Sequence, residues 1–208
     1  LRAWVASSDY AEDLRIDKTI LAQHAESYRK IRNTFRFILG NIKDNFEPQN
    51  LDNLKIEEFS ELEKYILHRL FSVDQYIKEN LKSYNFHKIY KELLNFCTLD
   101  LSSFYFDIRK DTLYCDSVDS QRRKDCILVL NTVLDCLLKW FAPILSFTTE
   151  EIFKLLNKNS EESIHLKKFP SIKKDWKNDT IKENWNKIIK IRDETNSSIE
   201  KKREEKLI

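Results

Sequence analysis

The chain has 208 residues and a formal net charge of +2, from 36 lysines and arginines against 34 aspartates and glutamates, so any site for RNA must be a local patch on a balanced surface. It contains one glycine and three prolines, which excludes glycine-rich phosphate loops and the G-x-S-x-G nucleophile elbow and disfavours a hairpin-rich sheet protein. No apolar run approaches the ~20 residues of a membrane span, and no signal-peptide pattern is present, so we expect a cytoplasmic protein.

Cysteine and histidine patterns give no sign of a metal or catalytic centre. The four cysteines form no C-x-x-C pair, which favours reduced and mostly buried thiols: Cys97, Cys115, Cys126 and Cys136. One Glu-x-x-His sequence, Glu162 to His165, stands alone in a predicted loop, whereas di-iron bundles use such sequences in pairs. We therefore expect no metal site and no catalytic residue within this chain.

The first clear element is a helix that follows a connector at residues 1–16. Asp17 is a suitable N-cap for this helix. Apolar side chains then recur at steps of three and four, which predicts one buried helical face: Tyr28, Ile31, Phe35, Ile38 and Ile42. Gly40 loosens the predicted end of the helix, and Pro48 prevents further continuation.

Three more long helices are predicted, at 59–83, 86–109 and 119–142, the last of which stops before Pro143. The third of the four helices is expected to turn Leu99 and Ser103 inward and to be followed by a loop at 110–117. Four helices of similar length with short connections predict an all-α fold built on an antiparallel four-helix bundle.

The C-terminal part is predicted to add two helices. A short helix is expected within 143–157, with Thr148 and Glu151 as its capping box, and a last helix near Thr180, with Glu183 in the same role. A polar loop at 158–178 separates them. These patterns predict three parts: the connector 1–16, the bundle 17–160, and a segment 161–208 that contains the extra C-terminal helix.

Basic side chains on the first long helix are the best candidates for binding. Arg29, Arg32 and Arg36 form a row beside the predicted core face, with Asn33 next to it. Arginine suits bidentate phosphate contacts and stacking on bases, and asparagine suits a base edge. The alternative interpretation is a solvated helix face that pairs with nearby glutamates. Three aromatic residues in predicted loops are further candidates for stacking on unpaired bases: Tyr10, Tyr114 and Trp176.

Several segments resemble the isoleucyl-tRNA synthetases, a class I family. LRAWVASSDYAEDLR at 1–15 is similar to the stretch that follows the family's catalytic domain, and YRKIRNTFRFILGN at 28–41 is similar to the first helix of its anticodon-binding bundle. NFHKIYKELLNFC, SFYFDIRKDTLYCDS and WFAPILSFTTEEIF extend the similarity, in order, along essentially the whole chain.

The resemblance implies a fragment that recognises isoleucine tRNA for a catalytic domain elsewhere in the same polypeptide. ATP with magnesium, and zinc, are then expected only in other parts of that polypeptide, including its catalytic and C-terminal domains, and the parent enzyme is expected to be a monomer. Residues carried over by position as tRNA contacts are Asp13, Arg15, Asn33, Arg36, Lys110, Arg122 and Arg123. Trp140, Pro143 and Glu151 are expected to have structural roles. Two alternatives remain open: the same domain of a valyl or leucyl enzyme, or a helical scaffold that binds protein.

Overall fold

A computed structural model describes residues 1–42, 56–157 and 161–205. All regular secondary structure in these ranges is helical. Short 3₁₀ turns lie at Ile56–Glu58, Ile164–Leu166 and Lys174–Trp176, and a π-helical segment, Phe96–Tyr105, joins two of the α-helices without a break. The α-helices are α1 (Arg2–Ser7), α2 (Lys18–Ile42), α3 (Glu61–Lys82), α4 (Phe86–Asn95), α5 (Phe106–Cys115), α6 (Gln121–Phe141), α7 (Ser146–Leu156) and α8 (Asp179–Glu204).

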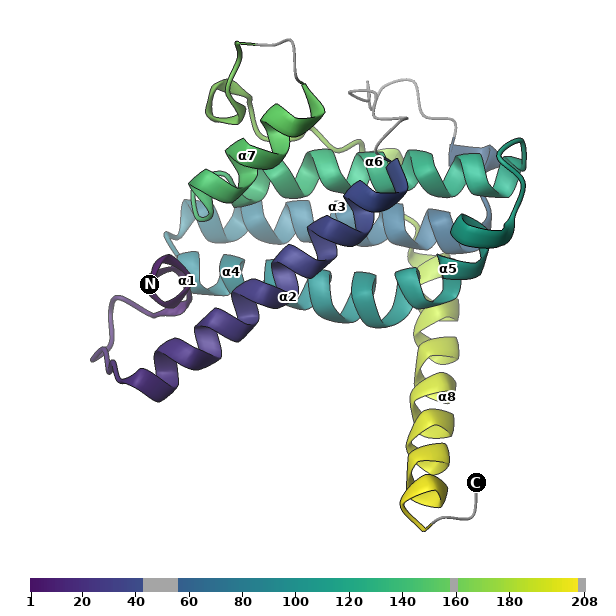
Figure 1. Cartoon of the computed structure of the whole chain (residues 1–208), viewed down its shortest axis with the longest axis horizontal. Coiled ribbons are helices and arrows are strands. Elements are labelled where there is room, and N and C mark those ends of the chain that lie inside the picture. Colours follow the sequence, from purple (N-terminus) through teal and green to yellow (C-terminus); the bar gives the residue numbers. More distant parts are fainter. Residues whose placement is uncertain (43–55, 158–160, 206–208) are drawn as a thin grey trace.

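The predicted bundle is confirmed, and Figure 1 shows its arrangement. The helix α3, the continuous rod of α4, the π-helical segment and α5, and the helix α6 run alternately in opposite directions, and α2 crosses them obliquely. Phe35 of α2 meets Phe141 of α6 edge to face, with ring centroids 6.0 Å apart. The buried side chains of these rods form one apolar core.

The helix α2 follows the predicted pattern closely. The Oδ1 atom of Asp17 accepts a hydrogen bond from the backbone N–H of Ile20 at 2.7 Å, so the predicted N-cap is confirmed. The predicted apolar row faces the core, with Tyr28 only partly buried. Thr34 is buried as well. Its hydroxyl is satisfied there, since it lies 3.3 Å from the carbonyl oxygen of Cys97 and 3.1 Å from Ser102 Oγ.

The third rod departs from the prediction because of its π-helical segment. A π-helix closes hydrogen bonds between residues five apart, so each turn holds more residues than an α-turn and the facing of later side chains shifts. Leu99 is 62% exposed and Ser103 is exposed, so their predicted inward orientation is wrong. The predicted loop at 110–117 is also wrong, since α5 continues to Cys115 and places Lys110 and Tyr114 on a helix.

The helix ends near the C-terminus differ in detail from the prediction. The helix α6 ends before Pro143 as predicted. The predicted capping box of Thr148 and Glu151 is wrong, because α7 starts at Ser146 without a side-chain cap, and Thr148 Oγ1 instead lies 2.8 Å from the hydroxyl of Tyr28. Asn178 is the cap of α8, where its Oδ1 accepts from the N–H of Ile181, so a cap at Thr180 is also wrong.

Residues 161–178, which precede α8, pack against the bundle, although their sequence is polar. Ile164, Ile172 and Trp176 are buried, so the predicted role of Trp176 as an exposed stacking residue is wrong. The helix α8 contacts α3 near its own N-terminus, through Trp185 among others, and then projects away from the bundle (Figure 1).

Candidate RNA-binding grooves

The helix α2 lies between two grooves that are open to solvent. The α2–α7 groove has a volume of about 430 Å³ and is lined by Arg29, Arg32, Asn33, Phe35, Arg36, Leu39, Thr148, Glu151, Ile152 and Leu155. The α2–α5 groove has a volume of about 600 Å³ and is lined by Asn33, Arg36, Phe37, Ser102, Phe106, Asp107, Lys110 and Tyr114. Asn33 and Arg36 line both grooves, so the predicted basic row forms the ridge between them.

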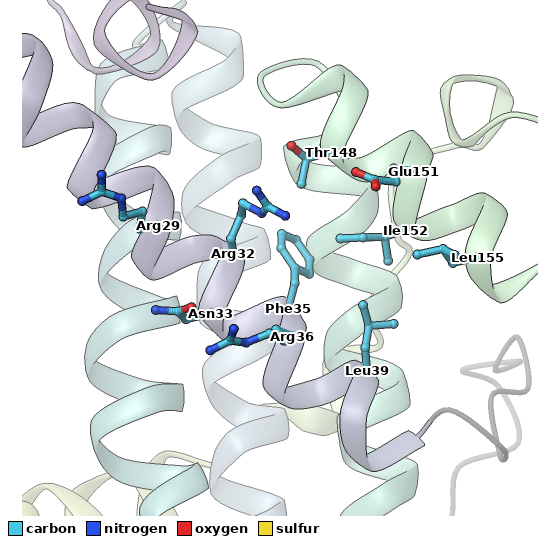
Figure 2. A pocket seen from close by; sticks show the side chains of 10 residues that line it. All are labelled: Arg29, Arg32, Asn33, Phe35, Arg36, Leu39, Thr148, Glu151, Ile152 and Leu155. Carbon is cyan, nitrogen blue, oxygen red and sulfur yellow. The ribbon is translucent and has the colours of Figure 1, made fainter.

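Figure 2 shows how the row divides over the two sides of this ridge. Arg32 points toward α7, whereas Asn33 and Arg36 point to the opposite side of α2. The guanidinium of Arg32 lies 5.9 Å from the ring centroid of Tyr28. Glu151 projects from the α7 wall, so this groove carries charges of both signs.

The arginines of the row differ in their pairing. Arg29 forms an ion pair with Glu26 at 2.8 Å, and both side chains are largely exposed, so the alternative interpretation of a solvated, paired face fits Arg29. Arg32 and Arg36 are exposed, and no residue in the described ranges forms an ion pair with either of them. Their charges are therefore open to a ligand from solvent.

The α2–α5 groove combines the unpaired Arg36 with an aromatic floor. Phe37 stacks on Phe106 with ring centroids 4.2 Å apart, and Tyr114 meets Phe37 edge to face at 6.4 Å. Tyr114 is 65% exposed, so its ring can take a flat apolar partner from solvent. Lys110 stands beside it on α5 and pairs with Asp107 at 3.0 Å.

The π-helical segment supplies one wall of the α2–α5 groove. Ser102 belongs to this segment, lines the groove, and donates a hydrogen bond to the carbonyl of Cys97 at 2.8 Å. The same carbonyl lies near the hydroxyl of Thr34 on α2, so the segment is tied to α2 at the groove. Irregular π-helical turns are often found at functional sites.

The other residues predicted to contact tRNA do not line either groove. Asp13 and Arg15 are exposed on the stretch between α1 and α2. Arg122 is exposed at the start of α6, and Arg123 donates a hydrogen bond to the carbonyl of Asp116 at 2.9 Å, which holds the turn before α6. Tyr10 is 64% exposed and lies against Phe86, at 6.5 Å between ring centroids.

Sequence reasoning missed four contributors to the α2–α5 groove: Phe37, Ser102, Phe106 and Asp107. Phe37 stands one residue outside the predicted basic row, and Ser102 lies where the π-helical segment changes the facing of side chains. One sequence signal could have indicated the groove: Lys110 and Tyr114 are four residues apart, so they share one face if this stretch is helical.

The described residues offer little for metal chemistry. Within them, no group of three or more histidine, cysteine, aspartate or glutamate side chains is placed to hold a metal ion. Cys97, Cys126 and Cys136 are buried and Cys115 is exposed. Burial raises the pKa of the Cys126 thiol to about 11. In the same part of the chain, no helix has the length and apolar character to cross a bilayer.

Comparison with known proteins agrees with this geometry. A family model described as the anticodon-binding domain of tRNA ligase matches residues 63–208. The chain belongs to this family. The match begins within the first turn of α3 and includes the π-helical and α5 walls of the α2–α5 groove, while α2 precedes it.

Named relatives extend the similarity over the whole chain. The isoleucine–tRNA ligase of Pelagibacter ubique is 59% identical over 208 residues, which are 100% of this chain and 23% of that protein. The isoleucine–tRNA ligase of Agrobacterium fabrum is 42% identical, and isoleucine–tRNA ligase 1 of Oceanobacillus iheyensis is 41% identical, again over 100% of this chain. The chain thus spans about a fifth of the length of these relatives.

Proposed function

We propose that this chain is the anticodon-binding part of an isoleucine–tRNA ligase, and that it holds isoleucine tRNA in position for a catalytic site elsewhere in the same polypeptide. The observation that carries the proposal is the α2–α5 groove, in which Asn33, Arg36, Lys110 and Tyr114 meet on one open surface. The relatives that match the whole chain support the choice of isoleucine tRNA by their names.

Each of these side chains suits a different part of an unpaired RNA loop. Arg36 and Lys110 are cations for phosphates, and they set the position of the strand without reading its sequence. The exposed ring of Tyr114 suits stacking on a splayed base, and the amide of Asn33 suits a base edge. Arg32 provides a further cation on the α7 side of the ridge.

The remaining predicted contacts lie outside the grooves and form part of the same proposal. Asp13, Arg15 and Arg122 are exposed and are proposed to touch other parts of the tRNA, as is Arg123, which is half-buried and bonded to the carbonyl of Asp116. ATP with magnesium, and zinc, are proposed to act in other parts of the polypeptide. The parent enzyme is proposed to be a cytoplasmic monomer.

The test is a titration of the chain with isoleucine tRNA and with valine tRNA, at low and at moderate salt. Arg36→Ala should weaken binding of isoleucine tRNA by about 1–3 kcal/mol, because it removes a charge-assisted hydrogen bond, and Lys110→Ala should also weaken it. Arg203→Ala is the matched control, since Arg203 is an exposed arginine paired with Glu200 at 2.8 Å and lines neither groove. The triple Arg29/Arg32/Arg36→Ala variant should lose the most. Binding of the parent chain should fall with salt, because bound phosphates release counterions.

The outcomes separate this function from the alternatives. Tighter binding of valine tRNA than of isoleucine tRNA would assign the domain to a different synthetase. Equal binding by the parent chain and by all the variants would favour a scaffold that binds protein.

A further inference from the structure

Arg192 connects the projecting helix α8 to the wall of the α2–α5 groove. Its terminal NH2 nitrogen donates to the carbonyl oxygen of Ser103 at 3.0 Å and to Oδ2 of Asp107 at 3.2 Å. Its guanidinium also lies 5.8 Å from the ring centroid of Phe104. These contacts fix Arg192 against the π-helical segment and the first turn of α5.

Asp107 is shared between this arginine and the groove. Oδ1 of Asp107 accepts from Nζ of Lys110 at 3.0 Å, while Oδ2 accepts from Arg192. The hydrogen bond from Lys110, and after it the one from Arg192, lowers the pKa of Asp107, so the carboxylate keeps its negative charge. A carboxylate on the groove wall opposes an RNA phosphate unless cations balance it.

The geometry points to a role for the second cation. If Lys110 were the only partner of Asp107, moving Lys110 onto a phosphate would leave a bare carboxylate beside the incoming RNA. With Arg192 in place, Asp107 keeps a partner when Lys110 turns away, and the cluster of two cations and one carboxylate remains positive. Lys110 is 52% exposed at its side chain and has the freedom to move.

Arg192 belongs to α8, so its contact with Asp107 depends on how α8 is docked on the bundle. Trp185, earlier in α8, packs against Tyr65 at 5.7 Å and Phe104 at 5.8 Å between ring centroids. Beyond Arg192, the hydrogen bonds and ion pairs of α8 within the described residues stay inside the helix, as for Thr195 and Arg203. Arg192 is thus the last polar anchor of α8 on the bundle in the described part of the chain.

We infer that Arg192 is a positioning residue for tRNA binding: by holding Asp107 from α8, it releases Lys110 to contact a phosphate in the α2–α5 groove. The inference rests on the proposed function of that groove. It makes tRNA affinity depend on whether the first half of α8 is docked on the bundle.

A double-mutant cycle in the full chain tests the inference by titration with isoleucine tRNA at low salt. Arg192→Gln should weaken binding about two- to fivefold, the range of one partly exposed charge interaction. In an Asp107→Asn background the same change should have no further effect, because the carboxylate that Arg192 neutralises is gone. Arg192→Lys should restore most of the affinity. Lys190→Gln is the matched control, as it removes a positive charge from an exposed position of the same helix.

The outcomes also distinguish this inference from the function on which it rests. A loss for Arg192→Gln that is equal in both backgrounds, or equal to that of Lys190→Gln, would mean that Arg192 acts as a general positive charge and would overturn the inference alone. So would an unchanged affinity for Arg192→Gln while Lys110→Ala weakens binding. If the parent chain did not bind tRNA, or Lys110→Ala bound normally, the groove's proposed function would fail as well. Circular dichroism of each variant confirms that helix content is unchanged.

Discussion

Glu63 of α3 and Arg109 of α5 form an ion pair that is almost wholly shielded from water, with side-chain exposures of 1% and 6%. Two parallel hydrogen bonds join them, Nε to Oε1 at 2.7 Å and an NH2 nitrogen to Oε2 at 2.6 Å. The hydroxyl of Tyr105 donates to the same carboxylate, and Arg109 also donates to Ser60. Buried charges need this degree of satisfaction, because the loss of water is otherwise uncompensated.

Arg109→Met should therefore lower the free energy of unfolding by about 3–5 kcal/mol, since it leaves the Glu63 carboxylate buried without a counter-charge. Denaturant unfolding followed by circular dichroism measures the change. The double variant Glu63→Leu/Arg109→Met should recover most of the loss, because it removes both charges. A double variant as unstable as the single one would contradict the prediction that the unpaired Glu63 carboxylate causes the loss. It would indicate that the packing of the Arg109 side chain matters more than its charge.

At the scale of elements, one hydrogen bond joins α3 to the start of α8. The backbone N–H of Asn178, the N-cap of α8, donates to Nδ1 of His68 at 2.9 Å. His68 is buried, and its Nδ1 must be unprotonated to accept this bond. Burial, followed by the charge of Lys182, lowers the pKa of His68. The attachment of α8 is thus built on a neutral imidazole.

This arrangement predicts a loss of stability in mild acid. Because the folded-state pKa of His68 lies below its unfolded-state value of about 6.5, its stabilising contribution is complete above that value. The contribution is lost as the pH falls from there through the folded-state pKa. Melting temperatures measured at pH 7.5 and at pH 5 should therefore differ less for His68→Asn, whose side-chain oxygen can accept the same bond without titrating.

The same pH comparison on His165→Asn is the control, because it removes an imidazole from an exposed position that takes no part in attaching α8. An acid-induced change in His68→Asn as large as in the parent chain would show that other groups are responsible.

At the scale of the whole molecule, the bundle encloses most of its thiols. Cys97, Cys126 and Cys136 lie in the core formed by the four rods, and Cys115 at the end of α5 is exposed. Burial raises the pKa of each of the three enclosed thiols, which keeps them protonated and unreactive as well as inaccessible.

A thiol reagent such as DTNB at pH 8 should accordingly modify one cysteine in the folded chain and all four after unfolding. Cys115→Ser should abolish the fast reaction and leave the slow, unfolding-limited one. Rapid modification of more than one thiol in the native chain would show that the core opens more readily than its packing indicates.

Local sequence patterns correctly predicted the long helices α2, α3 and α6 and the buried face of α2. Ile31, Phe35 and Ile38 recur with the helical period, so the side of α2 that enters the core follows from spacing alone. The scarcity of glycine and the end of α6 before Pro143 were also readable from the sequence. Glycine loosens the backbone only at its own position, and proline lacks the N–H that the next helical turn would need, so both effects are local.

Features that depend on contacts between distant residues were beyond the reach of these patterns. The π-helical segment accepts a hydrogen bond from Thr34 of another helix, and Leu99 within it faces out. The helix α5 that follows the segment continues far enough to include Tyr114. Trp176 lies in a segment that reads as a polar loop, and only packing on the bundle buries it.

The amino-acid sequence by itself determined the helical class, the order of the rods and, through the resemblance, the family, because these are set by periodicity and by residues close in the chain. The tertiary structure decided which members of the basic row are unpaired, and it brought Asn33 and Arg36 next to Lys110 and Tyr114. It also placed Arg192 on Asp107, across 85 residues of chain. The physical reason is that a groove is made by side chains from separate helices, whose relative rotation is fixed only when the core packs.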